Sequence, residues 1–171
     1  MSRFANQCWS IAPFLGLVAF AALFVWFSSR GLPNVVASHF GASGQANGFM
    51  PREVYVWFML AIVVLVPLVL AVLPMRMFSN SKARINLPNR DYWMAPERRA
   101  ETIEILSRQA VRFSTMLMAF LCYVHWLVIQ ANQTVPPTLS SQWFVSGLVV
   151  FLVGTLFWVV TLIGRFRNVP R

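Results

Sequence analysis

The chain has 171 residues, of which 58% are hydrophobic and 11% are charged, and it contains 7 Trp and 15 Phe. Soluble domains carry about 25% charged residues, and a globule of this length cannot bury so much apolar surface, so the composition excludes a soluble protein and predicts an integral membrane protein. The formal net charge of +9 does not predict a nucleic-acid partner, because Lys and Arg gather on cytoplasmic segments of membrane proteins and no basic stripe with interleaved aromatic residues is present.

The sequence contains four long apolar runs, at residues 9–28, 54–74, 112–131 and 143–164. Each run is long enough to cross a hydrocarbon core of about 30 Å as a helix with a rise of ~1.5 Å per residue. The first run exceeds the apolar core of roughly 7–15 residues in a cleaved signal peptide, which favours a retained helix. Pro67 removes a backbone hydrogen bond from the second run and predicts a kink. We therefore expect an all-α integral membrane protein built as a bundle of four transmembrane helices.

The first two runs are joined by a polar segment, residues 29–53, whose composition predicts an ordered loop. The segment holds four glycines, two prolines and one of the two histidines of the chain. Leu32-Pro33 predicts an extended exit from the first helix, because the residue before a proline avoids the helical region.

Two residue pairs further along this loop have predicted roles. Asn47-Gly48 predicts a tight turn, because both residues tolerate the positive φ angles that such turns require. His39-Phe40 is expected to pack the loop onto the helix ends. The predicted product is an ordered cap over the first two helices.

Residues 75–111 form the longest polar segment, and they predict a helical extension before the third span. Tyr92 and Trp93 stand among charged residues, as interfacial aromatic residues do. Pro96 suits the first position of a helix, and the apolar residues after it keep a helical spacing as far as position 113. The third helix is therefore expected to begin about four turns before the membrane, where it packs on its own bundle, on lipid headgroups or on a partner. The residues of interest are Tyr92, Trp93, Pro96, Glu97, Arg98 and Arg99.

The lysines and arginines predict the orientation. Of the 14 Lys and Arg residues, only Arg30 and Arg52 lie in the segment at 29–53, and the other 12 lie near the two termini or between positions 76 and 112. Because basic residues gather on the cytoplasmic side, we expect both termini in the cytoplasm and the loop outside it. Tryptophans then fall into two interfacial belts, an outer one of Trp26, Trp57, Trp126 and Trp143 and an inner one of Trp9 and Trp158.

His125, near the outer end of the third run, is the only histidine in the predicted spans, and no Asp, Glu or Lys lies within them. Ion-coupled transporters need carboxylates or chains of titratable groups at depth, which these spans do not offer. We expect His125 and His39 to face the same outer vestibule. A zinc site needs three or four ligands, and only Glu53 is near; Ser38 and Ser43 have no acid that would orient His39 for nucleophilic catalysis. We therefore expect no catalytic residue, no metal and no cofactor.

Small residues predict where helices approach closely. Gly147, Gly154 and Thr161 recur every seven residues in the fourth run, and Ala12 with Gly16 forms a small-xxx-small pair in the first. These faces can meet within one chain or between chains, so the oligomeric state stays open.

The loop holds a motif of Leu32, Pro33, His39, Phe40, Gly44, Asn47, Gly48 and Phe49. Its order and spacing resemble the outer loop of a widespread, largely uncharacterised bacterial membrane domain. The same domain forms the N-terminal part of SdpI-type proteins, which include immunity proteins against a secreted toxic peptide. The resemblance covers about residues 10–75, with a further similarity to small stand-alone members over residues 86–101, and it implies a multi-pass protein of the bacterial cytoplasmic (inner) membrane.

The sequence departs from this family at four loop positions. Ala37 and Ala46 stand where proline is usual, Gly41 where asparagine is usual, and Asn47 where aspartate is usual. The longer immunity proteins also have additional C-terminal spans for which 171 residues leave no room. The resemblance therefore implies the architecture and not the immunity activity.

The expected function is that of a non-enzymatic binding or accessory protein of immunity, sensor or complex-associated type. Its outer loop would engage a peptide, a lipid or a membrane-protein partner in the bilayer. The alternative is a small transporter or channel for a small or lipid-like solute, gated by Pro67 and His125. An enzymatic alternative would place a metal between His39 and His125.

Overall fold

The computed structural model describes residues 2–79 and 85–169; Lys82, Arg84 and Arg171, which entered the charge count above, lie outside these ranges. The described elements, in chain order, are α1 (Ser2–Ser28), the short 3-10 helix η1 (Ser29–Gly31), β1 (Val35–Phe40), β2 (Ala46–Pro51), α2 (Arg52–Leu60), the π-helical η2 (Ala61–Leu65), α3 (Val66–Ser79), α4 (Arg90–Trp93), α5 (Arg99–Ala131) and α6 (Ser141–Arg167).

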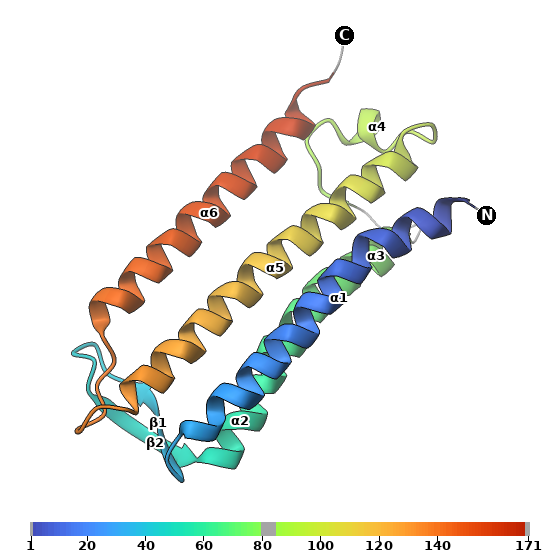
Figure 1. The fold of residues 1–171 in the computed structure, drawn as a ribbon. Coiled ribbons are helices and arrows are strands. Elements are labelled where there is room, and N and C mark those ends of the chain that lie inside the picture. The colour runs from blue at the N-terminus through green and yellow to red at the C-terminus, as the bar shows by residue number, and fades with distance from the viewer. Residues whose placement is uncertain (1, 80–84, 170–171) are drawn as a thin grey trace.

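Four helical stretches are long and apolar enough to cross a membrane: Ile11–Gly31, Arg52–Pro74, Arg99–Ala131 and Ser141–Arg167. This confirms the prediction of a mostly helical, multi-pass membrane protein. In Figure 1 the stretches lie side by side, with the β1–β2 hairpin at one end of the bundle and α4 with both termini at the other. We call these the hairpin end and the α4 end.

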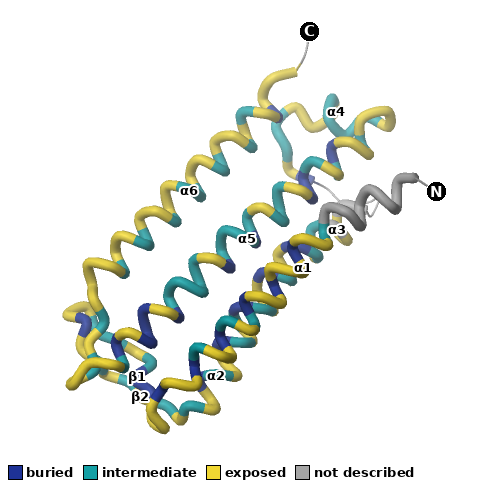
Figure 2. The backbone as a smooth tube through the Cα atoms, viewed as in Figure 1, coloured by how far each residue is buried: buried dark blue, intermediate teal, exposed yellow. Residues whose placement is uncertain are grey.

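The core is formed by three of the four long stretches. The buried apolar side chains come from α1, from α2 to α3 and from α5, and they include Phe14, Val18, Val25, Tyr55, Val63 and Met118. Figure 2 shows buried positions along these helices, whereas α6 is mostly exposed or intermediate along its length. The fourth helix therefore packs on the outside of a three-helix core, against α5.

The predicted disturbance at Pro67 takes the form of a π-helical turn. Residues 61–65 form η2, and the Val66 N–H bonds to the Ile62 carbonyl at its end. Proline has no N–H, and its ring clashes with the carbonyl four residues earlier, which here is that of Val63. A wider π turn immediately before the proline moves this carbonyl away and accommodates the ring.

The helical extension before the third span is present, but it begins three residues after Pro96. α5 runs for 33 residues from Arg99, and Pro96 lies in the turn that precedes it. The Thr102 hydroxyl donates to the Trp93 carbonyl at 2.8 Å, and the Arg98 and Arg99 amides both bond to the Ala95 carbonyl at 2.9 Å. These bonds stabilise a turn at 95–98 and displace the helix start from the predicted proline.

Two of the small residues in α6 allow it to approach α5. A Cβ on Gly147 would lie 2.1 Å from Cε1 of Tyr123, and a Cβ on Gly154 would lie 3.1 Å from Cε of Met116. The Tyr123 hydroxyl also donates to the Trp143 carbonyl at 2.7 Å. The predicted close approach is therefore found in α6, within one chain. At Gly16 it is not found, because a Cβ there would have no heavy atom within 4 Å.

Candidate functional site

The segment between α1 and α2 is a β-hairpin, so the expectation of an all-α chain is wrong here. β1 pairs with β2 in antiparallel register, with Val35 opposite Pro51, Ala37 opposite Phe49 and His39 opposite Gly48. Leu32 leads into it with φ −75° and ψ 148°, which confirms the extended exit predicted from Leu32-Pro33.

The hairpin turns at Gly44 and not at the predicted Asn47-Gly48 pair. Gly44 has a φ of 82°, and its N–H bonds to the Gly41 carbonyl at 2.9 Å. Gly48 lies inside β2, where a Cβ would be 2.8 Å from Cβ of His39. Gly48 is therefore explained by the close approach of the opposite strand and Gly44 by its backbone conformation.

The hairpin is fastened to the end of α5 by Asn132. The Asn132 Oδ1 accepts from the Ala37 N–H at 2.8 Å, and its Nδ2 donates to the Ala37 carbonyl at 2.9 Å. The loop after α5 adds backbone bonds, from the Leu139 N–H to the Gly44 carbonyl at 2.8 Å and from the Ala46 N–H to the Pro137 carbonyl at 3.3 Å. We call residues 32–52 and 132–140 together the cap.

Sequence reasoning missed Asn132. Its only signal was an amide, close to two glutamines, directly after the last apolar residue of the third run. A helix C-cap accounts equally well for such a residue, and its partner, Ala37, is 95 residues away in sequence. Only the packed structure identifies its role.

On one edge of the hairpin the outward backbone groups bond to Asn132, and on the other edge the outward backbone groups of one residue, Phe49, have no described partner. In an antiparallel ladder the residues of alternate pairs direct their N–H and C=O groups away from the neighbouring strand. The Ala37–Phe49 pair is of this kind, since Asn132 occupies the outward groups of Ala37. The outward groups of Phe49 have no partner among the described residues. The cap therefore presents a short open strand edge at Phe49.

The hairpin face next to this edge is apolar. Val35 and Phe49 point to the same face, because Phe49 is opposite Ala37, two residues from Val35. Their side chains are 61% and 57% exposed. The outward backbone groups of Phe49 on β2 thus lie beside two exposed apolar side chains, those of Phe49 itself and of Val35 on β1.

The side chains of His39 and Phe40 lie in different environments. Phe40 packs against the core, as predicted, but His39 is exposed, and its Nδ1 donates to Asn47 Oδ1 at 2.6 Å. The prediction that both residues fold onto the helix ends is therefore right for Phe40 and wrong for His39.

His125 lies at the junction of three helices. Its side chain is 0% exposed, with Nδ1 2.9 Å from the Tyr55 hydroxyl of α2 and Nε2 3.0 Å from the Ser28 hydroxyl of α1. Ser28 donates its own hydroxyl hydrogen to the Phe24 carbonyl, so Nε2 carries the proton and Nδ1 accepts from Tyr55. Every polar atom of the ring therefore has a partner.

The predicted vestibule shared by His39 and His125 is wrong. His125 is enclosed by α1, α2 and α5, with Tyr55 stacked on it at 5.7 Å between ring centroids, whereas His39 is exposed on the hairpin. In the described part of the chain, no group of three His, Cys, Asp or Glu residues is placed to hold a metal ion.

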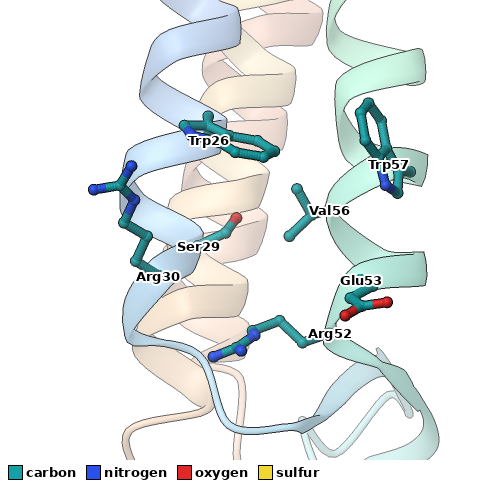
Figure 3. Close-up of a pocket in the computed structure, with 7 residues that line it drawn as sticks. All are labelled: Trp26, Ser29, Arg30, Arg52, Glu53, Val56 and Trp57. Atoms are coloured by element: carbon teal, nitrogen blue, oxygen red, sulfur yellow. The ribbon is translucent and has the colours of Figure 1, made fainter.

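A cavity of about 420 Å³ opens between α1 and α2 at the hairpin end (Figure 3). Trp26 and Trp57 lie on the side toward the middle of the bundle, and Arg52 and Glu53 lie on the side toward the hairpin. Arg52 Nη1 donates to the Leu32 carbonyl at 3.2 Å. The remaining lining residues are Ser29, Arg30 and Val56.

The polar residues predicted before the third span hold the α4 end together. Trp93 donates its indole N–H to the Phe166 carbonyl at 2.8 Å, and their rings meet edge to face at 5.4 Å. The guanidinium of Arg98 lies 4.0 Å from the centroid of the Tyr92 ring. Asn89, which sequence reasoning missed, donates to the last carbonyls of α6. This cluster anchors the end of α6 to the start of α5.

Residues 14–72 match the model of a protein family described as a domain of unknown function (DUF1648). The match begins in α1, includes the hairpin and ends in α3. No curated protein and no solved structure matches the chain. Residues 14–72 are thus similar to this uncharacterised domain family, over nearly the same stretch as the resemblance predicted for residues 10–75.

Proposed function

We propose that the chain is a non-enzymatic accessory protein of a bacterial cytoplasmic membrane, and that its cap binds a peptide in extended conformation outside the cell. The observation that carries the proposal is Phe49, whose backbone N–H and C=O have no partner within the described ranges while the residue is 57% exposed. An extended peptide can add a strand to such an edge and bury an apolar side chain beside it. The bonds of Asn132 to Ala37 keep the edge in place before the peptide arrives, which lowers the entropic cost of binding.

The charge distribution supports a cap outside the cell. Among the described residues of the hairpin end, Arg30 and Arg52 are the basic side chains, whereas the α4 end has many more, including Arg90, Arg98 and Arg99. Basic residues on the cytoplasmic side would place α4 and both termini inside.

The transport alternative has less support, because it assigns the gate to His125 together with Pro67. That ring is fully enclosed and hydrogen-bonded through both nitrogens.

The test uses a photo-crosslinking amino acid at Val35, next to the open edge, in cells that produce the full chain. Phe49→Pro removes the outward N–H without touching the β1–β2 ladder, because proline is tolerated where a strand N–H faces away from its neighbour. Phe49→Leu keeps the N–H and an apolar side chain. We expect a discrete polypeptide adduct that falls about tenfold in Phe49→Pro, as loss of one backbone hydrogen bond to the ligand predicts.

The same adduct should persist in Phe49→Leu, and all three proteins should unfold at closely similar temperatures. Equal adduct in Phe49→Pro and Phe49→Leu would refute binding at the strand edge. Absence of any polypeptide adduct from position 35 would refute the cap as the binding surface.

A further inference from the structure

The cavity between α1 and α2 has a polar atom buried in its wall. Ser29 is 2% exposed, it lines the cavity, and its hydroxyl has no hydrogen-bond partner among the described residues. Figure 3 shows this hydroxyl directed between the two helices, on the side of Val56. A buried hydroxyl without a partner costs free energy, so a ligand that supplies an acceptor here would gain from it.

The entrance of the cavity holds two opposite charges that do not neutralise each other. Arg52 and Glu53 are neighbours in sequence and both line the cavity, but they form no ion pair within the described part of the chain. Arg52 uses one N–H for the Leu32 carbonyl, and a guanidinium has five. A ligand that satisfies both side chains needs a negative group for the arginine and a positive group for the glutamate.

The surroundings of the cavity are those of a membrane interface. Trp26 and Trp57, with ring centroids 6.2 Å apart, separate the charged entrance from the rest of the bundle (Figure 3). Beyond them the exposed side chains of α1 and α2 are apolar and include Leu23 and Phe58. Tryptophan pairs of this kind lie at the level of lipid headgroups, so a ligand with a charged head and apolar tails fits both parts of the site.

We propose that this cavity binds the headgroup of a zwitterionic phospholipid with a primary amine. The phosphate lies on Arg52 and accepts the Ser29 hydroxyl, the ammonium lies on Glu53, and the acyl chains run along α1 and α2 past the tryptophans. The site shares neither Phe49 nor Val35 with the peptide-binding edge, so either proposal can fail without the other.

The experiment measures which lipid the purified full chain retains from mixed micelles, by native mass spectrometry. The probes are phosphatidylethanolamine and phosphatidylglycerol with identical acyl chains, offered in equal amounts. We expect a preference of about tenfold for phosphatidylethanolamine, because its ammonium pairs with Glu53 while the phosphate charge of both lipids is the same. Glu53→Gln should remove the preference.

Two further variants separate lipid binding from structural effects. Ser29→Ala removes a hydroxyl that has no partner in the described part of the chain, so the delipidated protein should be as stable as before or more so. Retention of phosphatidylethanolamine should fall several-fold. Glu97→Gln is the matched control, because it removes the same charge from an exposed glutamate at the α4 end, outside the cavity. It should leave the preference unchanged.

Soluble competitors distinguish a lipid from a free anion. Millimolar inorganic phosphate and millimolar phosphoethanolamine should each fail to displace the lipid, since neither has acyl chains. Displacement by phosphate would show an anion site, and displacement by phosphoethanolamine a site for a soluble zwitterion; each would overturn the proposal. A lipid preference that survives Glu53→Gln would overturn it as well, because a glutamate at a helix start then only stabilises the helix end.

Discussion

His125 is a buried polar side chain with one partner for each ring nitrogen, and those partners come from two other helices. Hydrogen bonds between membrane helices contribute modestly, about 0.6 kcal/mol on average in measured cases. The larger effect is expected when the ring is removed, because the Tyr55 hydroxyl then remains buried without an acceptor and a cavity forms. The histidine therefore acts as a structural junction of α1, α2 and α5.

We predict that His125→Ala destabilises the protein by about 2–4 kcal/mol and that Tyr55→Phe costs about 1 kcal/mol. The double variant should be destabilised by less than the sum of the two single variants, since both substitutions remove the same hydrogen bond. Unfolding in detergent measures all three, with Trp126→Phe at the adjacent position as the control. An unchanged stability of His125→Ala would mean that the histidine is not a structural junction.

The hairpin is an element whose position depends on a single side chain from a distant part of the chain. We predict that Asn132→Ala leaves the helices intact but loosens β1, because the Ala37 N–H and C=O lose their only described partner. Hydrogen exchange at the Ala37 amide should accelerate by a factor of about ten or more, which corresponds to one or two hydrogen bonds. Gln133→Ala removes a neighbouring amide that makes no side-chain bond to the described residues, and it should leave this exchange rate unchanged. Equal rates in the two variants would contradict the fastening role of Asn132.

Helix α6 depends on α5 for its packing, and Gly147 is the position where the two approach most tightly. Gly147→Ala would place a methyl group 2.1 Å from Tyr123, so we expect a destabilisation of about 1–3 kcal/mol and an increased distance between spin labels on α5 and α6. Gly164→Ala is the matched control on the same helix, because a Cβ there meets nothing within 4 Å. Similar stabilities of the two variants would contradict the close packing.

The sequence predicted the helices well because the signal for a membrane span is local: a run of apolar residues long enough to cross the bilayer. The hairpin was not predicted, since its strands are short and β2 contains Gly48 and Pro51, which weaken a strand pattern. The turn was predicted at Asn47-Gly48 because both residues tolerate positive φ angles, although the pair lies inside β2. His125 was found from its rarity in a span, but the orientation of its ring depends on Ser28 and Tyr55, and no sequence pattern relates these residues.

At the scale of the whole molecule, a three-helix core carries the cap at one end. Helix α6 packs along α5 on the outside of this core, and the α4 cluster lies at the opposite end (Figure 1). The peptide-binding edge at Phe49 and the lipid site at Arg52 and Glu53 both lie at the hairpin end. The peptide proposal therefore needs the hairpin end to face the outside of the cell, with the basic α4 end in the cytoplasm.

Side-selective cysteine labelling in intact cells tests this requirement most directly. Cys8 and Cys122 are replaced by serine, and single cysteines are introduced by Asn47→Cys on the exposed hairpin and Glu97→Cys at the exposed α4 end. A membrane-impermeant maleimide should label position 47 in intact cells and position 97 only after the membrane is opened. Labelling of position 97 in intact cells, with position 47 protected until permeabilisation, would contradict an extracytoplasmic cap.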